Sequence, residues 1–213
     1  MKYPKSLDEL IESFKLLPGI GEKNAERLSF AVLQFSEENA NKFSDSIKNV
    51  KNKIIKCKIC NNLTEDNDEC SICNNYTEES DICEICSNDS RDKSTICVVE
   101  SVKDLILFEK SNAYKGKYHV LGGLISPLEG VNPEDIKINE LIKRIEKEDI
   151  KEVILALNLS MEGETTSLYI LKLLEGTDVS VTKIAAGIPV GADMEYLDSL
   201  TIQRALEGRN KLS

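Results

Sequence analysis

Residues 57–86 read CKICNNLTEDNDECSICNNYTEESDICEIC and contain three Cys-x-x-Cys pairs. Two residues between cysteines allow both thiolates of one tight turn to face a single ion. Two such turns supply the four sulfurs of a structural zinc site. The chain has only one histidine, so a site that needs two histidines is excluded. We therefore predict a zinc site, and its candidate ligands are Cys57, Cys60, Cys70, Cys73, Cys83 and Cys86.

The alternative for these cysteines is a set of disulfides, which persist in oxidising compartments. The amino terminus lacks the apolar stretch of a secretory signal. No run of about eighteen apolar residues is present either. We therefore expect a cytoplasmic protein with reduced thiols and no membrane partner.

The charge is unevenly distributed. The formal net charge is −10, which argues against a surface built uniformly for nucleic acid. Residues 1–56, however, carry ten Lys and Arg against eight Asp and Glu, whereas residues 57–97 carry three against ten. A phosphate-binding face is therefore expected in the first segment.

Three helices are predicted before the cysteines. Ser6 and Glu9 fit a capping box for the first helix. Pro18-Gly19-Ile20-Gly21 ends that helix in a tight reversal, and a second helix covers about residues 22–35. Ser36 caps the third, which has an apolar seam of Ala40, Phe43, Ile47, Val50 and Ile54.

The reversal between the first two helices has the features of a phosphate-binding hairpin. Gly19 and Gly21 permit close approach of a backbone, and the next helix begins with free amides at a positive dipole end. Lys23 and Arg27 lie four residues apart, where both could reach a nucleic-acid backbone. The alternative is an ordinary glycine turn in a helical bundle with two solvated cations.

Strands and helices alternate after the cysteines. Strands are predicted at about residues 95–100, 118–121, 152–157 and 179–184, with helices after residue 101, at about 139–147 and at 165–174, and a last helix at about 199–207. Alternation of this kind is typical of βαβ units and a mostly parallel sheet. Cys97 and His119 fall within strands, and we predict structural roles for both.

Four acids follow the predicted strands. Ligands of parallel sheets gather beyond the carboxyl ends of the strands. Glu100 and Asp104 follow the first strand, and Glu162 and Glu164 follow the third. Such carboxylates could hold magnesium against phosphates. The alternative is a solvated acidic loop.

The hairpin sequence Leu17-Pro18-Gly19-Ile20-Gly21, followed by Lys23, Ala25 and Arg27, resembles the helix-hairpin-helix DNA-binding motif. More narrowly, it resembles the version that opens the RecR family of recombination mediators. The resemblance continues in order through the cysteines, Arg91-Asp92, residues 97–100, residues 118–130, residues 162–166 and residues 187–191.

The second half also resembles the Toprim fold, and Glu100 fits the first Toprim acid. Active Toprim enzymes also have an Asp-x-Asp pair after a later strand. Here that place reads Asn158-Leu159-Ser160-Met161-Glu162-Gly163. No Gly-x-x-x-x-Gly-Lys-Ser/Thr sequence is present to cradle phosphates, so ATP hydrolysis is not expected.

The resemblance implies a multidomain α+β fold. Its expected parts are a helix-hairpin-helix segment at 1–53, a zinc finger with an extra Cys-x-x-Cys repeat at 54–92, a Toprim domain at 93–186, and a Walker-B-like segment with a helix at 187–213. It also implies a non-enzymatic DNA-repair factor that forms a ring-like tetramer. Such a factor acts with RecO and, in many organisms, RecF to load a RecA-type recombinase on single-stranded DNA.

In this interpretation Gly19, Gly21, Lys23 and Arg27 contact DNA, while Glu100, Asp104, Glu162 and Glu164 contact RecO. Two rival functions remain open: a magnesium-dependent Toprim nuclease that uses these four acids, and a zinc-stapled scaffold that binds only protein.

The cysteine stretch contains an internal repeat. Residues 60–65 recur thirteen positions later as residues 73–78, and residues 70–73 recur as residues 83–86. The RecR pattern has room for two pairs, so one pair is extra and one zinc per chain is expected. Pairing 57/60 with 83/86 preserves both family flanks and is our preferred interpretation. Pairing adjacent turns preserves the family's short spacing, and two zincs would mean six cysteines sharing a cluster.

Overall fold

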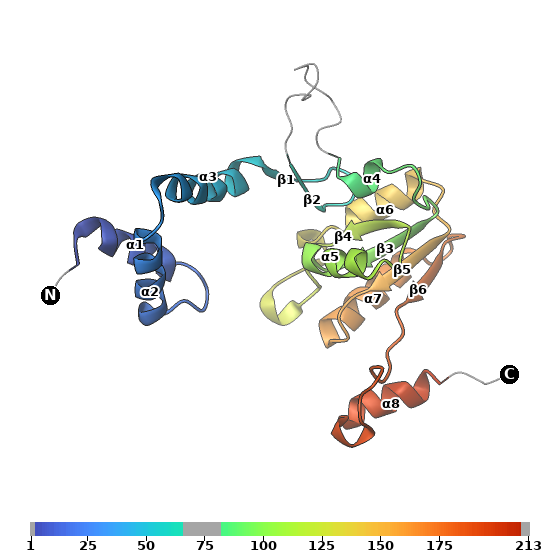
Figure 1. Ribbon diagram of the computed structural model, residues 1–213. Coiled ribbons are helices and arrows are strands. Elements are labelled where there is room, and N and C mark those ends of the chain that lie inside the picture. The colour runs from blue at the N-terminus through green and yellow to red at the C-terminus, as the bar shows by residue number, and fades with distance from the viewer. Residues whose placement is uncertain (1–2, 66–81, 210–213) are drawn as a thin grey trace, which may run out of the picture. The chain divides into compact units, whose positions relative to one another are not determined.

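The computed structural model describes residues 3–65 and 82–209. The chain divides into two compact units, Met1–Ile54 and Ile55–Ser213. The first consists of helices, and the second contains a short cysteine-bearing segment, a parallel sheet with helices and a carboxyl-terminal helix (Figure 1). These are the multidomain α+β elements that the sequence predicts.

The first unit contains α1 (Lys5–Lys15), α2 (Glu22–Leu33) and α3 (Glu37–Lys53). Helices α1 and α2 pack together, and Ile11 and Ala25 are almost completely buried. The predicted cap of α3 is confirmed, because the Ser36 side chain accepts a hydrogen bond from the Asn39 N–H at 3.2 Å.

One expectation for this unit is wrong. The capping box at Ser6 does not form, because α1 begins at Lys5 and the Pro4 carbonyl accepts from the N–H groups of Leu7 and Asp8 instead. The apolar seam predicted for α3 has no cover within this unit, since no residue of that helix is buried. Its larger side chains are exposed, including Phe43, Ile47 and Val50.

The second unit begins with a two-stranded sheet, β1 (Ile54–Lys56) and β2 (Leu63–Glu65), and the short helix α4 (Glu84–Ser87). The larger sheet has the order β4-β3-β5-β6, and all its pairings are parallel. Its strands are β3 (Thr95–Val99), β4 (Lys117–Val120), β5 (Glu152–Ala156) and β6 (Ser180–Lys183).

Helices cover both faces of this sheet, because alternate residues of each strand point to opposite sides. On one face Ile96 and Val98 pack with residues of α6 (Ile138–Lys147) and α7 (Met161–Leu173). On the other face Cys97 and Val99 pack with Leu105 of α5 (Val102–Ser111). Helix α8 (Ser199–Glu207) follows a 3-10 turn, Met194–Tyr196; two further 3-10 turns cover Pro127–Glu129 and Pro133–Asp135.

Helix α7 begins at Met161 rather than at the predicted residue 165. The Ser160 side chain accepts a hydrogen bond from the Gly163 N–H at 3.1 Å and caps the helix earlier. A side chain at position 163 would clash with the Asn158 carbonyl oxygen, so glycine permits this close start. As a result, Glu162 and Glu164 lie on the first turn of a helix and not on a loop.

Cys97 and His119 are both buried, as the structural roles predicted for these residues require. Burial raises the pKa of Cys97 to about 12. His119 Nε2 lies 2.8 Å from the Lys137 carbonyl oxygen, and burial lowers the pKa of its ring to about 4. Across the described ranges, no helix combines the length and the apolar character needed to cross a membrane.

Candidate zinc centre, DNA-binding hairpin and acidic cavity

Four cysteines from two separate turns converge in the second unit. The sulfurs of Cys57, Cys60, Cys83 and Cys86 all lie within 4.8 Å of one another. Cys57 and Cys60 are held in a tight turn between β1 and β2, where the Asn61 N–H donates to the Cys57 carbonyl at 3.0 Å. Cys83 directly precedes α4, and the Cys86 N–H donates to the Cys83 carbonyl at 2.9 Å.

The chemistry of this cluster fits zinc. Four sulfurs at about 2.3 Å from one ion would be about 3.8 Å apart, and the Cys60 and Cys83 sulfurs are 3.6 Å apart. A disulfide would need about 2.05 Å, and the described cysteines are all free thiols. The Cys60 thiol, by hydrogen bonding, holds the pKa of Cys57 far below its ordinary value. The cofactor is one zinc ion, which when bound crosslinks the two turns.

Cys70 and Cys73 lie outside the described residues, so the structure does not report on the third pair. The four cysteines that it brings together are those of our preferred pairing. They form a compact group, and Cys57, Cys60 and Cys83 are at most 3% exposed.

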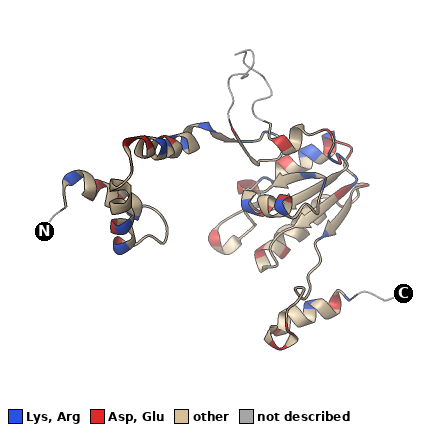
Figure 2. Ribbon diagram, in the orientation of Figure 1, with Lys and Arg blue, Asp and Glu red and all other residues tan. Residues whose placement is uncertain are grey.

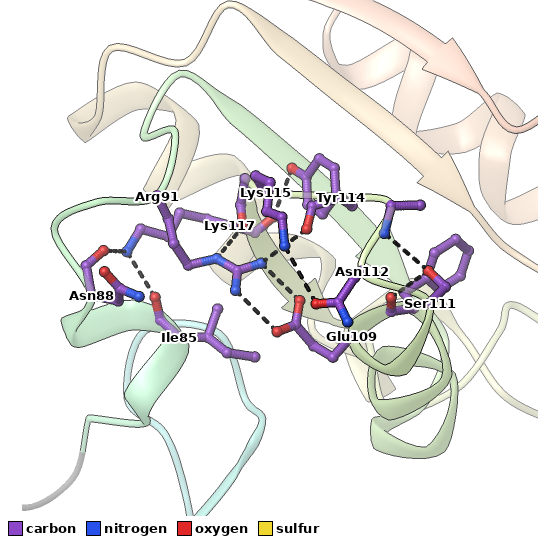
Figure 3. Close-up of polar contacts among 12 residues, drawn as sticks. Ile85, Asn88, Arg91, Glu109, Ser111, Asn112, Tyr114, Lys115 and Lys117 are labelled. Atoms are coloured by element: carbon purple, nitrogen blue, oxygen red, sulfur yellow. Dashed lines mark hydrogen bonds and ion pairs between the residues drawn. The ribbon is translucent and has the colours of Figure 1, made fainter.

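Both cysteine turns are attached to β4, an edge strand of the larger sheet. The Val120 N–H donates to the Cys60 carbonyl at 2.8 Å. The Lys117 ammonium donates to the carbonyls of Ile85, Cys86 and Asn88, at 2.8, 3.0 and 2.9 Å. Figure 3 shows Lys117 with Ile85 and Asn88. An edge strand is protected from pairing with other chains when another segment covers it.

Arg91 is a structural residue whose role sequence reasoning missed. Its guanidinium forms a bidentate pair with Glu109 of α5, at 2.7 and 3.0 Å, and Nε donates to the Gly116 carbonyl at 2.8 Å (Figure 3). It also lies over the Tyr118 ring, 5.7 Å from its centroid. Because these partners lie 18 to 27 residues away, no local pattern could have identified them.

The predicted hairpin is present in the first unit. The Ile20 N–H donates to the Leu17 carbonyl at 3.1 Å, and Gly19 has a φ of +79°, as a type II turn requires. Gly21 caps α2 in an extended conformation without any side-chain hydrogen bond to the helix end. Lys23 and Arg27 are exposed, and neither forms an ion pair with another described residue.

The four predicted acids are divided between different environments. Glu100 and Glu162 line one cavity of about 590 Å³ at the carboxyl ends of β3 and β5. Asp104 instead completes a capping box with Ser101 at the start of α5. Glu164 pairs with Lys183 at 2.6 Å, which holds the pKa of that carboxyl below its usual value.

The same cavity contains two acids that the sequence interpretation missed, Glu129 and Asp135. At the place where an active Toprim enzyme has a further acid, the Asn158 amide donates to Glu100 at 2.6 Å. An amide donor beside Glu100 removes one of the carboxylates that a magnesium site would use.

Family models match four consecutive parts of the chain. They describe the RecR helix-hairpin-helix for residues 7–51, the RecR four-cysteine zinc finger domain for residues 68–88, the Toprim domain for residues 94–185 and the RecR C-terminal region for residues 187–210. The zinc-finger match covers Cys70, Cys73, Cys83 and Cys86, whereas the clustered sulfurs come from Cys57, Cys60, Cys83 and Cys86.

Curated relatives match nearly the whole chain. "Recombination protein RecR" of Chlorobium limicola is 47% identical over 215 residues, which cover 99% of both chains. The protein of the same name from Chlorobium phaeobacteroides is 48% identical over 216 residues, which cover 100% of both. With this similarity over its full length, and with the hairpin, cysteine centre and parallel sheet in family order, the chain belongs to the RecR family of recombination proteins.

Proposed function

We propose that this protein is a non-catalytic recombination mediator. It binds DNA through the hairpin and acts in the cytoplasm with RecO and, where present, RecF to load a RecA-type recombinase on single-stranded DNA. The observation that carries the proposal is the glycine hairpin with two exposed, unpaired cations in a chain of this family. The parts that do this work are segments 1–53, 54–92, 93–186 and 187–213.

We expect the hairpin to contact DNA for electrostatic reasons. The start of α2 offers N–H groups that no side chain caps, next to two glycines that leave open space around the backbone. A helix start of this kind attracts phosphates. Lys23 and Arg27 would add phosphate contacts without reading bases, so binding should weaken steeply as salt rises.

The test is a charge reversal with a matched control. Lys23→Glu/Arg27→Glu should weaken binding to labelled single- and double-stranded DNA by about tenfold or more. The control is Lys143→Glu/Lys147→Glu, which reverses two lysines at the same spacing on α6. Fluorescence anisotropy over a salt series measures both, and equal losses in the two variants would contradict the hairpin assignment.

The acids after the strands are proposed as the RecO contact. Glu100 and Glu162 are the strongest members of this set, because both line the cavity and neither is ion-paired among the described residues, whereas Asp104 is held in a capping box and Glu164 in an ion pair with Lys183. Glu100→Gln/Glu162→Gln should weaken RecO binding in a titration, whereas Glu146→Gln/Glu175→Gln, at two exposed acids, should not. Magnesium-dependent cleavage of DNA by the wild-type chain, abolished by Glu100→Gln, would instead support the nuclease alternative.

Self-association into a ring-like tetramer is part of the proposal. The exposed apolar side chains of α3, Phe43, Ile47 and Val50, would be covered by another copy. Phe43→Asp/Ile47→Asp should lower the mass measured by light scattering. An unchanged mass would remove α3 from the interface.

A further inference from the structure

Lys117 is a buried cation with no carboxylate partner among its hydrogen bonds. The residue is 5% exposed, and among residues 3–65 and 82–209 the only other buried lysine, arginine, aspartate or glutamate is Arg144, at 7%. Arg144 is paired with Glu148 at 3.0 Å. Lys117 donates to carbonyl oxygens instead. Buried charges are normally paired, so the charge of Lys117 requires a counter-charge that these carbonyl contacts do not supply.

The nearby acids already have other partners. A cavity of about 660 Å³ beside Lys117 and Cys86 is lined by Asp92, Glu148 and Asp149. Asp92 accepts hydrogen bonds from Ser94 and Thr95, Glu148 pairs with Arg144, and Asp149 pairs with Lys151. A fourth acid, Asp89, follows Asn88 and has its pKa lowered mainly by Lys93, with which it pairs, and to a smaller extent by Lys117. None of these four acids forms an ion pair with Lys117.

The cysteine cluster supplies the missing charge when it holds zinc. Four thiolates around a doubly charged cation leave two negative charges in excess. One of the three carbonyls that Lys117 binds belongs to Cys86, and another belongs to Ile85, the residue directly before it. The ammonium is thus fixed at the end of α4, the short helix that contains Cys86 and directly follows Cys83.

We propose that Lys117 is the counter-cation of the zinc–thiolate centre and a positioning residue for its second cysteine turn. Its charge offsets the excess negative charge of the thiolates, and its three hydrogen bonds hold α4 against β4. Metal binding and the attachment of the cysteine turns to the sheet are therefore coupled through one side chain. The inference rests on the ligand set Cys57, Cys60, Cys83 and Cys86 and is independent of DNA binding.

Replacing zinc by cobalt tests whether the charge of Lys117 acts on the metal centre. Lys117→Gln and Lys117→Met should each weaken Co²⁺ binding about ten- to a hundredfold, as loss of an outer partner of a metal site does. The sulfur-to-cobalt charge-transfer band should also move to lower energy, because a thiolate that loses a nearby cation is easier to oxidise. Lys115→Gln is the control, at an exposed lysine two residues earlier.

The inference requires both effects. If the variants bound Co²⁺ more weakly but the charge-transfer band did not move, Lys117 would act only through its hydrogen bonds, and the inference would be overturned. A band shift without a measurable loss of Co²⁺ affinity would overturn the inference as well. A wild-type spectrum without the intensity of a four-thiolate site would reject the ligand set instead.

A second measurement needs no variant. In the zinc-loaded wild-type protein, Lys117 should resist acetylation by a water-soluble amine reagent, and removal of zinc with a chelator should make it reactive. Lys115 should react equally in both states. Peptide mass spectrometry reads both residues, and a rate at Lys117 that does not depend on zinc would overturn the proposal even if the variants failed to fold.

Discussion

Two groups of cations in this protein have opposite surroundings. In the hairpin, Lys23 and Arg27 are exposed and have no ion-pair partner among the described residues. Near the cysteine centre, Arg91, Lys117 and Arg144 are largely buried, and each makes several hydrogen bonds within the chain. Figure 2 shows that Lys and Arg are present in both units, so the presence of positive residues alone does not identify the binding surface.

The two groups differ in whether their side chains are available to bind a ligand. A cation whose hydrogen bonds are satisfied inside the fold stabilises that fold and has little left for a ligand. A solvated cation contributes little to stability, yet it can displace counterions from a nucleic-acid backbone. Substitutions in the two groups should therefore separate stability from DNA binding.

The largest effect on stability should come from substitutions in the cysteine centre, near which the buried cations lie. Cys57→Ser/Cys60→Ser removes two of the four clustered thiols, so zinc should be lost and the second unit destabilised by several kcal/mol. That corresponds to a fall in Tm on the order of 10 °C, measurable by calorimetry together with metal analysis. The control is Cys70→Ser/Cys73→Ser, which should retain one zinc per chain; loss of zinc in that variant would show that the third pair ligates.

Arg91→Met should have the next largest effect. It breaks the bidentate pair with Glu109, in which the two side chains are 12% and 30% exposed, and leaves that carboxylate unpaired. We expect a loss of about 3 kcal/mol in urea unfolding. Lys93→Met, at an exposed pair with Asp89, should change stability by less than about 0.5 kcal/mol. DNA binding by Arg91→Met, measured well below its Tm, should equal that of the wild type.

Local signals made part of this molecule predictable from its sequence. The Cys-x-x-Cys spacing, the glycines of the hairpin and the β-branched strands each act over a few residues, and each predicted the right element. The cap at Ser160 is also local, but the apolar spacing used to predict α7 begins only at residue 165, so it does not place Glu162 on the helix.

The partners of the buried cations could not be predicted in this way. Lys117 meets carbonyls that lie 29 to 32 residues earlier in the chain, and Arg91 meets Glu109 only because α5 packs back on the sheet. The Ser101-x-x-Asp104 spacing is a local signal that predicts the cap, and the structure confirms it. Nothing local, however, indicates that Glu100 lines a cavity together with Glu162. These assignments depend on tertiary packing.

Substitution of His119 should have a smaller effect on stability. This residue contrasts with Lys117, because it is a buried base without a counter-charge. Its folded-state pKa of about 4 lies below the ordinary 6.5, so the unfolded chain binds more protons between these values. The stability it contributes is fully present above pH 6.5 and is lost as the pH falls toward 4. Between pH 7 and pH 5 the wild type should lose about 2 kcal/mol more than His119→Gln in urea unfolding. Parallel losses in both proteins would mean that the ring is not the responsible group.

The smallest effect on stability should come from the hairpin itself. Lys23→Ala/Arg27→Ala removes two solvated charges, so the free energy of unfolding should change by less than about 0.5 kcal/mol. The salt dependence of single-stranded DNA binding should nevertheless become shallower by about 1.4 in the slope of log K against log salt, because two phosphate contacts are lost. Arg91→Met should show the reverse pattern, with lower stability and an unchanged slope. If the hairpin variant lost stability and kept its slope, Lys23 and Arg27 would belong with the buried, structural cations, and the DNA-binding surface would lie elsewhere in the chain.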